Sequence, residues 1–140
     1  MSTVVVTGGA GYVGSHAAKA LAEAGDDVVV FDDLSAGHAE AIDRIARAFP
    51  DRTISLVQGD VLDRGALGRL FATTGASAVM HFAARLLVGE SVRQPIGYYR
   101  ANVTGTMTVL DAMAEAGIRR FLFSSTAATF GEPQASPVGG

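Results

Sequence analysis

The apolar residues of this chain occur in short, nearly unbroken runs that alternate with longer alanine-rich segments of helical spacing. Runs of four to eight β-branched and aromatic residues are typical of strands. We therefore expect strands at residues 3–7, 27–32, 53–58, 78–83 and 120–125. Residues 3–7 form an apolar run that ends in glycines, which is typical of a strand buried on both faces, as in a parallel sheet.

The segments between the apolar runs predict helices. We expect one helix that ends near residue 24 and others that span residues 39–48, 63–71 and 95–116. Gly25 and Pro50 are typical of residues that stop a helix. Strands that alternate with helical crossovers favour a doubly wound parallel α/β sheet, the Rossmann fold, with about five strands and helices on both faces.

The composition limits the classes of function. The 140 residues, 49% of them hydrophobic, suffice for one domain with a core but not for two. A net charge of −3 with scattered arginines argues against nucleic acid or an anionic membrane as partner. The chain has no cysteine, and its opening apolar run is too short for a signal peptide or a membrane span. We expect a soluble cytoplasmic protein whose ligand is a small neutral or anionic metabolite.

A glycine-rich loop, TGGAGYVGSH, joins the first predicted strand to the first predicted helix. Gly8, Gly11 and Gly14 are spaced three apart, and Gly9, Gly11 and Gly14 also match G-x-G-x-x-G. Such glycines allow a sharp turn, close approach of a pyrophosphate to the backbone, and tight packing of helix on strand. The helix N-terminus would then offer N–H groups to the diphosphate. The alternative is a turn that only lets a strand meet a helix, but the strand before and helix after the loop favour the dinucleotide site.

Carboxylates follow the second and third predicted strands. Asp32 lies 18 residues beyond Gly14, where its carboxylate can accept hydrogen bonds from both hydroxyls of an adenosine ribose. A 2′-phosphate would face Asp32 and Asp33 with no arginine before Arg44, so the sequence favours NAD over NADP. Asp60 could meet the adenine amino group. The alternative for these three residues is a local role as loop or helix caps.

Several motifs in order give the chain a family resemblance. They are TGGAGYVGSH, FDDLSAG, QGDV, VMHFAA, VGESV, PIGYYRANVTGT and FLFSSTAATFGEP. With them the chain resembles the NAD-binding N-terminal portion of the UDP-glucose 4-epimerases, which are extended short-chain dehydrogenases/reductases. The resemblance implies a tightly held NAD that takes a hydride from C4 of a UDP-hexose and returns it to the opposite face. It also implies that the complete enzyme is a homodimer.

The resemblance also assigns roles by position. It implies a catalytic role for Thr126, which would hydrogen-bond the reacting sugar hydroxyl. The diphosphate would lie over Tyr12 and Val13. The residues implied around the adenosine ribose are Asp32, Asp33, Leu34, Ser35, Ala36 and Gly37. Those implied at the adenine and along the middle of the cofactor are Asp60, Val61, Phe82, Ala83 and Ala84.

Two positions depart from the family pattern, and two further polar residues have open roles. Leu86 stands where the family commonly has a lysine against the cofactor ribose, and Arg85, one position earlier, could substitute for it. Phe130 replaces a tyrosine. His81, among apolar neighbours, is better explained as a packed, hydrogen-bonded core residue than as a catalytic or metal-binding one, and we assign no metal. Asn102 could reach the cofactor or only bond neighbouring backbone.

The family's proton relay, Tyr-x-x-x-Lys, is absent from the 140 residues. Lys19 is the only lysine, and it follows Ser15, not a tyrosine, by four positions. We therefore interpret residues 1–140 as an incomplete NAD-binding Rossmann domain that stops before the sixth strand and lacks a substrate domain. Three hypotheses for the chain stay open. It is a portion of a UDP-glucose 4-epimerase that is inactive alone, an NAD-binding module that senses NAD without turnover, or a chain that a partner completes in trans.

Overall fold

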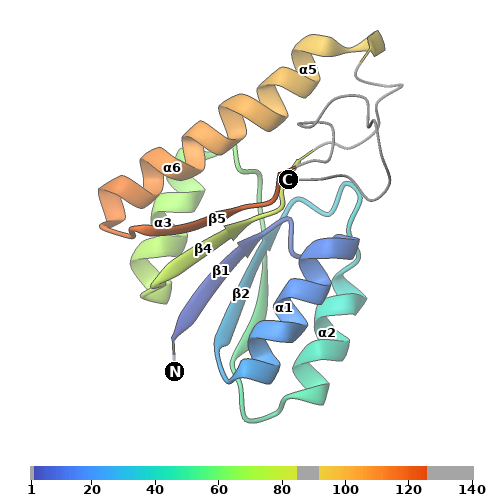
Figure 1. The fold of residues 1–140 in the computed structure, drawn as a ribbon, viewed down its shortest axis with the longest axis vertical. Helices are drawn as coiled ribbons and strands as arrows, with labels where there is room; N and C mark the ends of the chain where they lie inside the picture. Colours follow the sequence, from blue (N-terminus) through green and yellow to red (C-terminus); the bar gives the residue numbers. More distant parts are fainter. Residues whose placement is uncertain (1, 85–91, 126–140) are drawn as a thin grey trace, which may run out of the picture.

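The computed structural model describes residues 2–84 and 92–125 (Figure 1). The chain alternates strands and helices, as the sequence predicts. The elements are β1 (Thr3–Thr7), α1 (Tyr12–Ala24), β2 (Asp27–Asp32), α2 (Ala39–Ala48), β3 (Ile54–Gln58), α3 (Arg64–Thr74), β4 (Ala78–His81), α5 (Pro95–Tyr99), η1 (Arg100–Thr104), α6 (Gly105–Ala116) and β5 (Arg120–Phe123).

The five strands form one parallel sheet in the order β3-β2-β1-β4-β5. The chain builds outward from β1 to β3 and then crosses back to add β4 and β5 on the other side of β1. The order therefore reverses at β1, next to β4. In open α/β sheets the ligand binds outside the carboxyl ends of the strands at such a switch point. The predicted doubly wound parallel sheet is confirmed.

The sheet is covered on both faces, and each face has its own core (Figure 1). Alternate residues of a strand point to opposite sides of the sheet. Val5, Val29 and Val79 pack toward α3 and α6, whereas Val6 and Val30 pack toward α1 and α2. Because valines pack on both sides of the sheet, the middle residues of β1 and β2 are all apolar, and polar residues stand only at the ends of these strands.

The three later strands are shorter than the predicted runs, and the two outer strands are less buried. β4 ends at His81 because its partner β1 ends at Thr7, where the chain turns into the glycine loop. β5 ends at Phe123, the partner of His81, for the same reason. β3 and β5 are the edge strands, and most of their residues are only partly covered. The burial on both faces that the sequence predicts for residues 3–7 is confirmed, since residues 4–7 of β1 are buried.

Helix α3 is one turn longer than predicted. Asp63 caps its N-terminus, where the carboxylate accepts a hydrogen bond of 2.9 Å from the Ala66 N–H. The helix continues through Thr73 and Thr74, whose hydroxyls donate to the carbonyls of Arg69 and Leu70 at 2.9 and 2.8 Å. It ends only at Gly75, which has φ +61°. The two hydroxyls are thus satisfied within the helix, and the left-handed backbone of Gly75 ends it.

The predicted single helix over residues 95–116 contains a π-helical segment, η1, between α5 and α6. The Gly105 N–H donates to the Arg100 carbonyl, five residues back, which defines a π turn. A side chain at Gly105 would lie 3.0 Å from Val61 Cγ2, so the segment runs close to the end of β3. Single π turns inside α-helices are frequent at functional sites.

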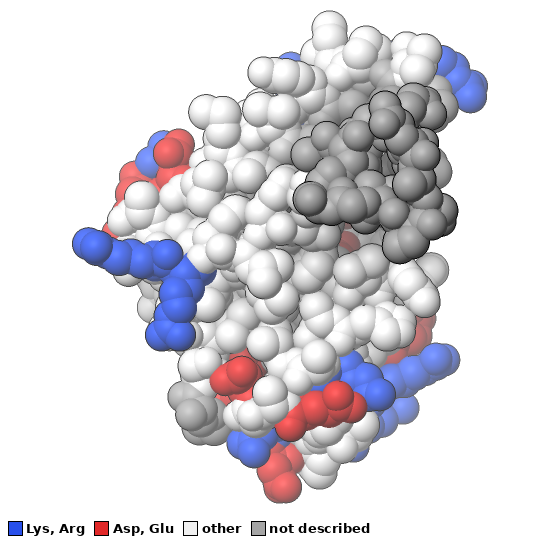
Figure 2. Space-filling model, in the orientation of Figure 1, with Lys and Arg blue, Asp and Glu red and all other residues white. Residues whose placement is uncertain are grey.

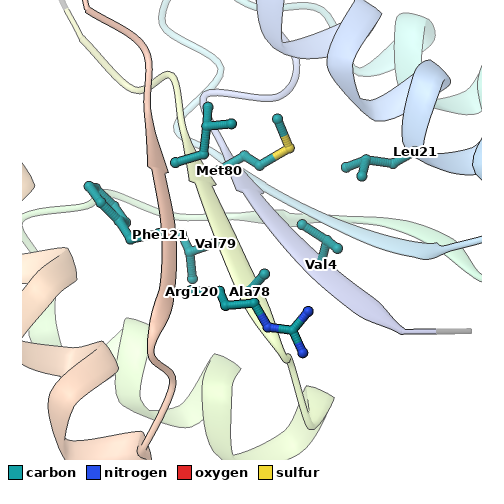
Figure 3. A pocket seen from close by; sticks show the side chains of 8 residues that line it. Val4, Leu21, Ala78, Val79, Met80, Arg120 and Phe121 are labelled. Atoms are coloured by element: carbon teal, nitrogen blue, oxygen red, sulfur yellow. The ribbon is translucent and has the colours of Figure 1, made fainter.

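One face of β4 and β5 is open on the side of α1. Helices α1 and α2 cover β1, β2 and β3 there, whereas the described helices leave β4 and β5 uncovered (Figure 1). Figure 2 shows mainly uncharged atoms over this region. A shallow depression of about 230 Å³ lies between Val4, Leu21, Met80 and Leu122 (Figure 3). It is apolar apart from Arg120 and lies over the middle and amino-terminal parts of the strands, so it does not fit a nucleotide.

No helix within residues 2–84 and 92–125 is both long and apolar enough to cross a bilayer.

Candidate functional site

The candidate site lies at the carboxyl ends of the inner strands, where four loops meet. Backbone hydrogen bonds tie the loops to neighbouring strands at this edge. The Gly8 N–H donates to the Phe31 carbonyl at 2.8 Å, and the Phe82 N–H donates to the Thr7 carbonyl at 2.8 Å. The Gly59 N–H donates to the Asp32 carbonyl at 3.0 Å. These hydrogen bonds hold the loops at the carboxyl ends of the strands in fixed positions relative to the sheet.

The glycine loop leaves no room for a side chain at Gly8, Gly9 or Gly14, and at Gly8 and Gly14 the nearest atoms are backbone. Gly8 has φ +68°, and a Cβ there would lie 2.6 Å from the backbone nitrogen of Ala83. A Cβ at Gly14 would lie 2.3 Å from the Gly8 carbonyl oxygen. These distances are too short for any real contact, and the atoms met are backbone. Gly14 thus lets α1 pack directly on the turn, which is the role that the spacing predicts.

Gly11 has a different environment from Gly8 and Gly14. A Cβ at Gly11 would meet only the Gly8 carbonyl oxygen, at 3.4 Å. Protein packing therefore does not require glycine at this position. An open position at the helix N-terminus is what a diphosphate that approaches the backbone would need.

The N-terminus of α1 opens toward solvent at this loop. Its N-cap residue is Gly11, which has no side chain to cap the first turn, and the first turn has no acidic residue. Tyr12 and Val13 are exposed by 82% and 54%. A helix end with this composition carries a partial positive charge that is not balanced by a carboxylate of its own first turn. It suits an anion.

Asp32 joins the glycine loop to the loop that follows β2. Its Oδ2 accepts from the Ala10 N–H at 2.9 Å, and its Oδ1 accepts from the Leu34 N–H at 2.8 Å. The residue is buried, and Leu34 adopts a left-handed backbone with φ 62°. A carboxylate can accept about four hydrogen bonds, so two backbone donors leave room for two hydroxyl donors.

Asp33 and Asp60 make the local contacts that we considered as the alternative to cofactor binding. Asp33 Oδ1 accepts from the Ser35 N–H and hydroxyl at 2.9 and 2.7 Å. Asp60 Oδ1 accepts from the Leu62 N–H at 2.9 Å. Both carboxylates thus stabilise their own loops. Their contacts with a cofactor stay predictions.

The other predicted site residues are distributed along the same edge. Gly37 lies against the glycine loop, since a Cβ there would be 2.7 Å from the Ala10 backbone. Phe82 and Ala83 lie against Gly8, and Val61 lies against Gly105 at the end of η1. Asn102 belongs to η1, Ser35 and Ala36 to the loop after β2, and Ala84 to the loop after β4. Arg85 and Thr126 lie outside the described residues, and so does Phe130.

His81 is a buried, hydrogen-bonded core residue, as its apolar neighbours in the sequence predict. Its imidazole is 1% exposed and bonds Thr7 Oγ1 through Nδ1 and Thr106 Oγ1 through Nε2. Burial lowers its pKa from 6.5 to about 4. The two threonines were not predicted as partners of His81, because the motifs that contain these three residues lie far apart in the sequence and do not show which side chains meet. In the described part of the chain, no three His, Asp or Glu residues lie close enough together to hold a metal ion.

The low pKa of His81 predicts a loss of stability in weak acid. The unfolded chain binds a proton at His81 below about pH 6.5, whereas the folded chain resists protonation down to about pH 4. The free energy of unfolding should therefore fall by up to about 1.4 kcal/mol per pH unit between these values. Urea titrations followed by circular dichroism would measure this slope.

A His81→Asn variant is the control for this prediction, because it cannot titrate and should lose most of the slope. The pKa of Asp26 lies below its usual 3.8, because its carboxylate accepts hydrogen bonds from Ser2. Its protonation would cost stability only at still lower pH. An equal slope in the wild type and in His81→Asn would contradict the assignment to His81.

These observations define a class of protein. A parallel sheet of order 3-2-1-4-5, a glycine turn into an uncapped helix and a buried carboxylate at the end of the second strand together form a Rossmann-type dinucleotide-binding fold. The sequence model of the NAD dependent epimerase/dehydratase family matches residues 4–139, and the chain belongs to this family.

Similar sequences and structures agree with this assignment. The UDP-glucose 4-epimerase of Erwinia amylovora is 42% identical over 144 residues, which cover 99% of this chain and 42% of that protein. The UDP-glucose 4-epimerase of Bacillus subtilis is 42% identical over 135 residues, which cover 96% of this chain and 40% of that protein. The chain therefore spans about two fifths of the length of these curated relatives.

Two crystal structures share the fold closely. The UDP-glucose-4-epimerase from Stenotrophomonas maltophila, with bound NAD and formylated UDP-arabinopyranose, has a TM-score of 0.92 and 39% identity, over 99% of this chain and 41% of that one. The UDP-glucose 4-epimerase from Brucella ovis, in complex with NAD, has a TM-score of 0.87 and 43% identity, over 99% and 40%. The family resemblance drawn from the motifs is confirmed.

Proposed function

We propose that residues 1–140 form the NAD-binding portion of an epimerase that interconverts UDP-glucose and UDP-galactose. The observation that carries the proposal is the Asp32 carboxylate, which is buried at the end of β2 and bonded to the backbone of the glycine loop. It places an acceptor for ribose hydroxyls beside a turn suited to a diphosphate. The relatives that carry NAD have the same fold over nearly the whole of this chain.

The residues present fit NAD. The open position at Gly11 and the uncapped N-terminus of α1 would receive the diphosphate, with Tyr12 and Val13 beside it. Asp32 would bind the adenosine ribose through its two remaining acceptor sites. Phe82 and Ala83 would line the cofactor where it passes Gly8. The remaining residues that we propose for the cofactor are Asp33, Leu34, Ser35, Ala36, Gly37, Asp60, Val61, Ala84, Arg85 and Asn102.

The proposed reaction divides between cofactor and chain. When bound, NAD supplies the hydride acceptor and donor for C4 of the sugar. The chain's own part is to orient the cofactor through the glycine loop and Asp32, and to hold the reacting sugar hydroxyl through Thr126. The Tyr-x-x-x-Lys relay that the resemblance implies is not among the 140 residues. We therefore propose that this chain binds NAD and does not turn over alone.

The substrate, the assembly and the location are also proposals. Crystal structures of relatives from Bifidobacterium longum and Thermotoga maritima contain UDP and UDP-glucose, respectively. We propose a UDP-hexose substrate, a homodimer for the complete enzyme and a cytoplasmic location. Because no tyrosine among the 140 residues is followed by a lysine four positions later, a second candidate for these residues is an NAD-binding module that senses NAD without turnover. Activity measurements on an extended chain separate the two.

The proposed site predicts a preference for NAD over NADP. Asp32 would attract the 2′-hydroxyl and repel a 2′-phosphate, so we expect NAD to bind at least about tenfold more tightly. Asp32→Asn should weaken NAD binding and remove most of this preference. Calorimetric titration of both dinucleotides would measure the dissociation constants.

Asp43→Asn is a matched control, since it removes the same charge from an exposed carboxylate on α2 that lies outside the proposed site. It should change the preference much less than Asp32→Asn. Equal or tighter binding of NADP by the wild type would refute the role of Asp32.

A further inference from the structure

A series of three hydrogen bonds, two of them made by His81, connects elements far apart in the sequence. Thr7 Oγ1, at the end of β1, lies 2.5 Å from His81 Nδ1. His81 Nε2 lies 3.0 Å from Thr106 Oγ1, in the first turn of α6. Thr106 Oγ1 lies 2.7 Å from the Asn102 carbonyl oxygen in η1. The series joins the strand that leads into Gly8 to the π-helical segment.

The chemistry of the last group fixes the direction of every bond in the series. A carbonyl oxygen only accepts, so the single hydroxyl hydrogen of Thr106 must go to Asn102. Thr106 Oγ1 must then accept from His81, which places the imidazole proton on Nε2. Nδ1 of the neutral ring has no proton, so it accepts from the Thr7 hydroxyl. One tautomer of His81 satisfies all three bonds.

The surroundings of the imidazole make this tautomer the only well-satisfied one. Thr7 and His81 are 0% and 1% exposed, so water cannot replace a lost partner. The rings of Phe121 and Phe123 lie against the imidazole, with centroids 5.9 and 6.0 Å away. A buried polar group without a partner costs more than a hydrogen bond contributes. The series of hydrogen bonds from Thr7 to the Asn102 carbonyl therefore has one stable arrangement of donors and acceptors.

We propose that His81 is a positioning residue that sets the place of η1, and with it Asn102, relative to the glycine loop. This inference rests on the proposed function, in which Gly8 and Asn102 contact the same NAD. A rigid link between them matters because a binding site built from two separate elements loses affinity when either can move. The π turn at η1 makes such a link useful, because its backbone departs from the regular helical ladder.

Nitrogen NMR of the imidazole rings tests the direction of the bonds. In the wild type at pH 7, His81 should show a protonated Nε2 and an unprotonated Nδ1. Thr106→Val should move the proton to Nδ1, because valine cannot accept from Nε2, whereas the Thr7 hydroxyl can accept as well as donate. Thr106→Ser should restore the wild-type pattern. A protonated Nδ1 in the wild type, or no change in Thr106→Val, would overturn the proposal.

Thr108→Val is the matched control. The Thr108 hydroxyl donates to the Thr104 carbonyl at 2.8 Å, so it makes the same kind of bond on the same helix, but it is exposed and away from His81. Backbone amide shifts of both Gly8 and Asn102 should change in Thr106→Val and stay at their wild-type values in Thr106→Ser and Thr108→Val. Shifts confined to the residues next to position 106 would overturn a positioning role.

The affinity for NAD supplies the functional measurement. Thr106→Val should weaken binding by about fivefold, the effect of one lost hydrogen bond, and Thr106→Ser and Thr108→Val should not weaken it. Unchanged affinity in a Thr106→Val chain whose tautomer has switched would overturn the link to the site. If the wild type binds no NAD, the proposed function fails, and the tautomer and amide shifts still decide whether His81 positions η1.

Discussion

Gly14→Ala is expected to abolish measurable NAD binding and to destabilise the fold. The new Cβ would lie 2.3 Å from the Gly8 carbonyl oxygen and 2.7 Å from the Gly9 Cα. Both neighbours are backbone atoms of the turn, so α1 or the loop must shift. Overpacking typically costs about 1–3 kcal/mol and occasionally more, which exceeds the gain of about 1 kcal/mol from alanine in a helix.

Two other glycines provide the controls for this prediction. Gly68, in α3, has no atom within 4 Å of a built Cβ, so Gly68→Ala should leave stability unchanged or raise it. Gly11→Ala should fold normally, because its Cβ meets only the Gly8 oxygen at 3.4 Å, but should weaken NAD binding where the diphosphate approaches. Thermal unfolding and calorimetry would measure both properties. Wild-type stability and affinity in Gly14→Ala would show that the loop adapts and that the proposed packing role is wrong.

The central part of the fold could be predicted because its requirements are local. Uninterrupted valines at β1 and β2 indicate strands covered on both faces, and the glycine loop between β1 and α1 has one common structural context. The predicted ends of β4 and β5 were wrong because a strand in a sheet ends where its partner strand ends. For β4 that partner is β1, whose end at Thr7 is about 75 residues earlier in the chain.

The departures inside helices have a different cause. The predicted helix over residues 63–71 stopped three residues short of the end of α3 at Thr74. The hydroxyls of Thr73 and Thr74 bond carbonyls within that helix. The π turn at η1 changes the hydrogen-bond partner by one residue and leaves the spacing of apolar residues nearly unaltered. Periodicity therefore predicted the existence of the helix over 95–116 and could not locate the turn within it.

In the candidate site, too, some residues could be predicted from the sequence and others could not. Asp32 could be predicted from its distance to Gly14, since the βαβ unit fixes the separation of a glycine turn and the end of the next strand. The Thr7–His81–Thr106 series could not be predicted, because it joins residues separated by 74 and 25 positions, and the motifs that contain them do not show which side chains meet. Contacts of this kind depend on the packing of three elements. Only the structure places their side chains together.

The largest effect that we predict is the absence of 4-epimerase activity in the 140-residue chain, even with saturating NAD and UDP-galactose. Proton transfer by a positioned base is typically worth about 10²- to 10⁴-fold in rate. Thr126 is the residue that we propose at the sugar hydroxyl, and a threonine hydroxyl is too weak a base at neutral pH to take a proton unaided. None of the three tyrosines, Tyr12, Tyr98 and Tyr99, is followed by a lysine four residues later. The loss would come from the missing base and from the missing lysine, which would also position the cofactor.

A coupled assay for UDP-glucose on the purified chain would test this, with Thr126→Ala as the control. Turnover above background that Thr126→Ala lowers would mean that another residue supplies the base, and the prediction would fail. Extending the chain through a segment that carries Tyr-x-x-x-Lys and a substrate domain should create activity if the chain is a portion of an epimerase. An extended chain that binds NAD and UDP-sugar but shows no turnover would instead favour the sensing module. The epimerase activity of the extended chain thus distinguishes the two proposed functions, because they share the cofactor site and differ only in the catalytic base.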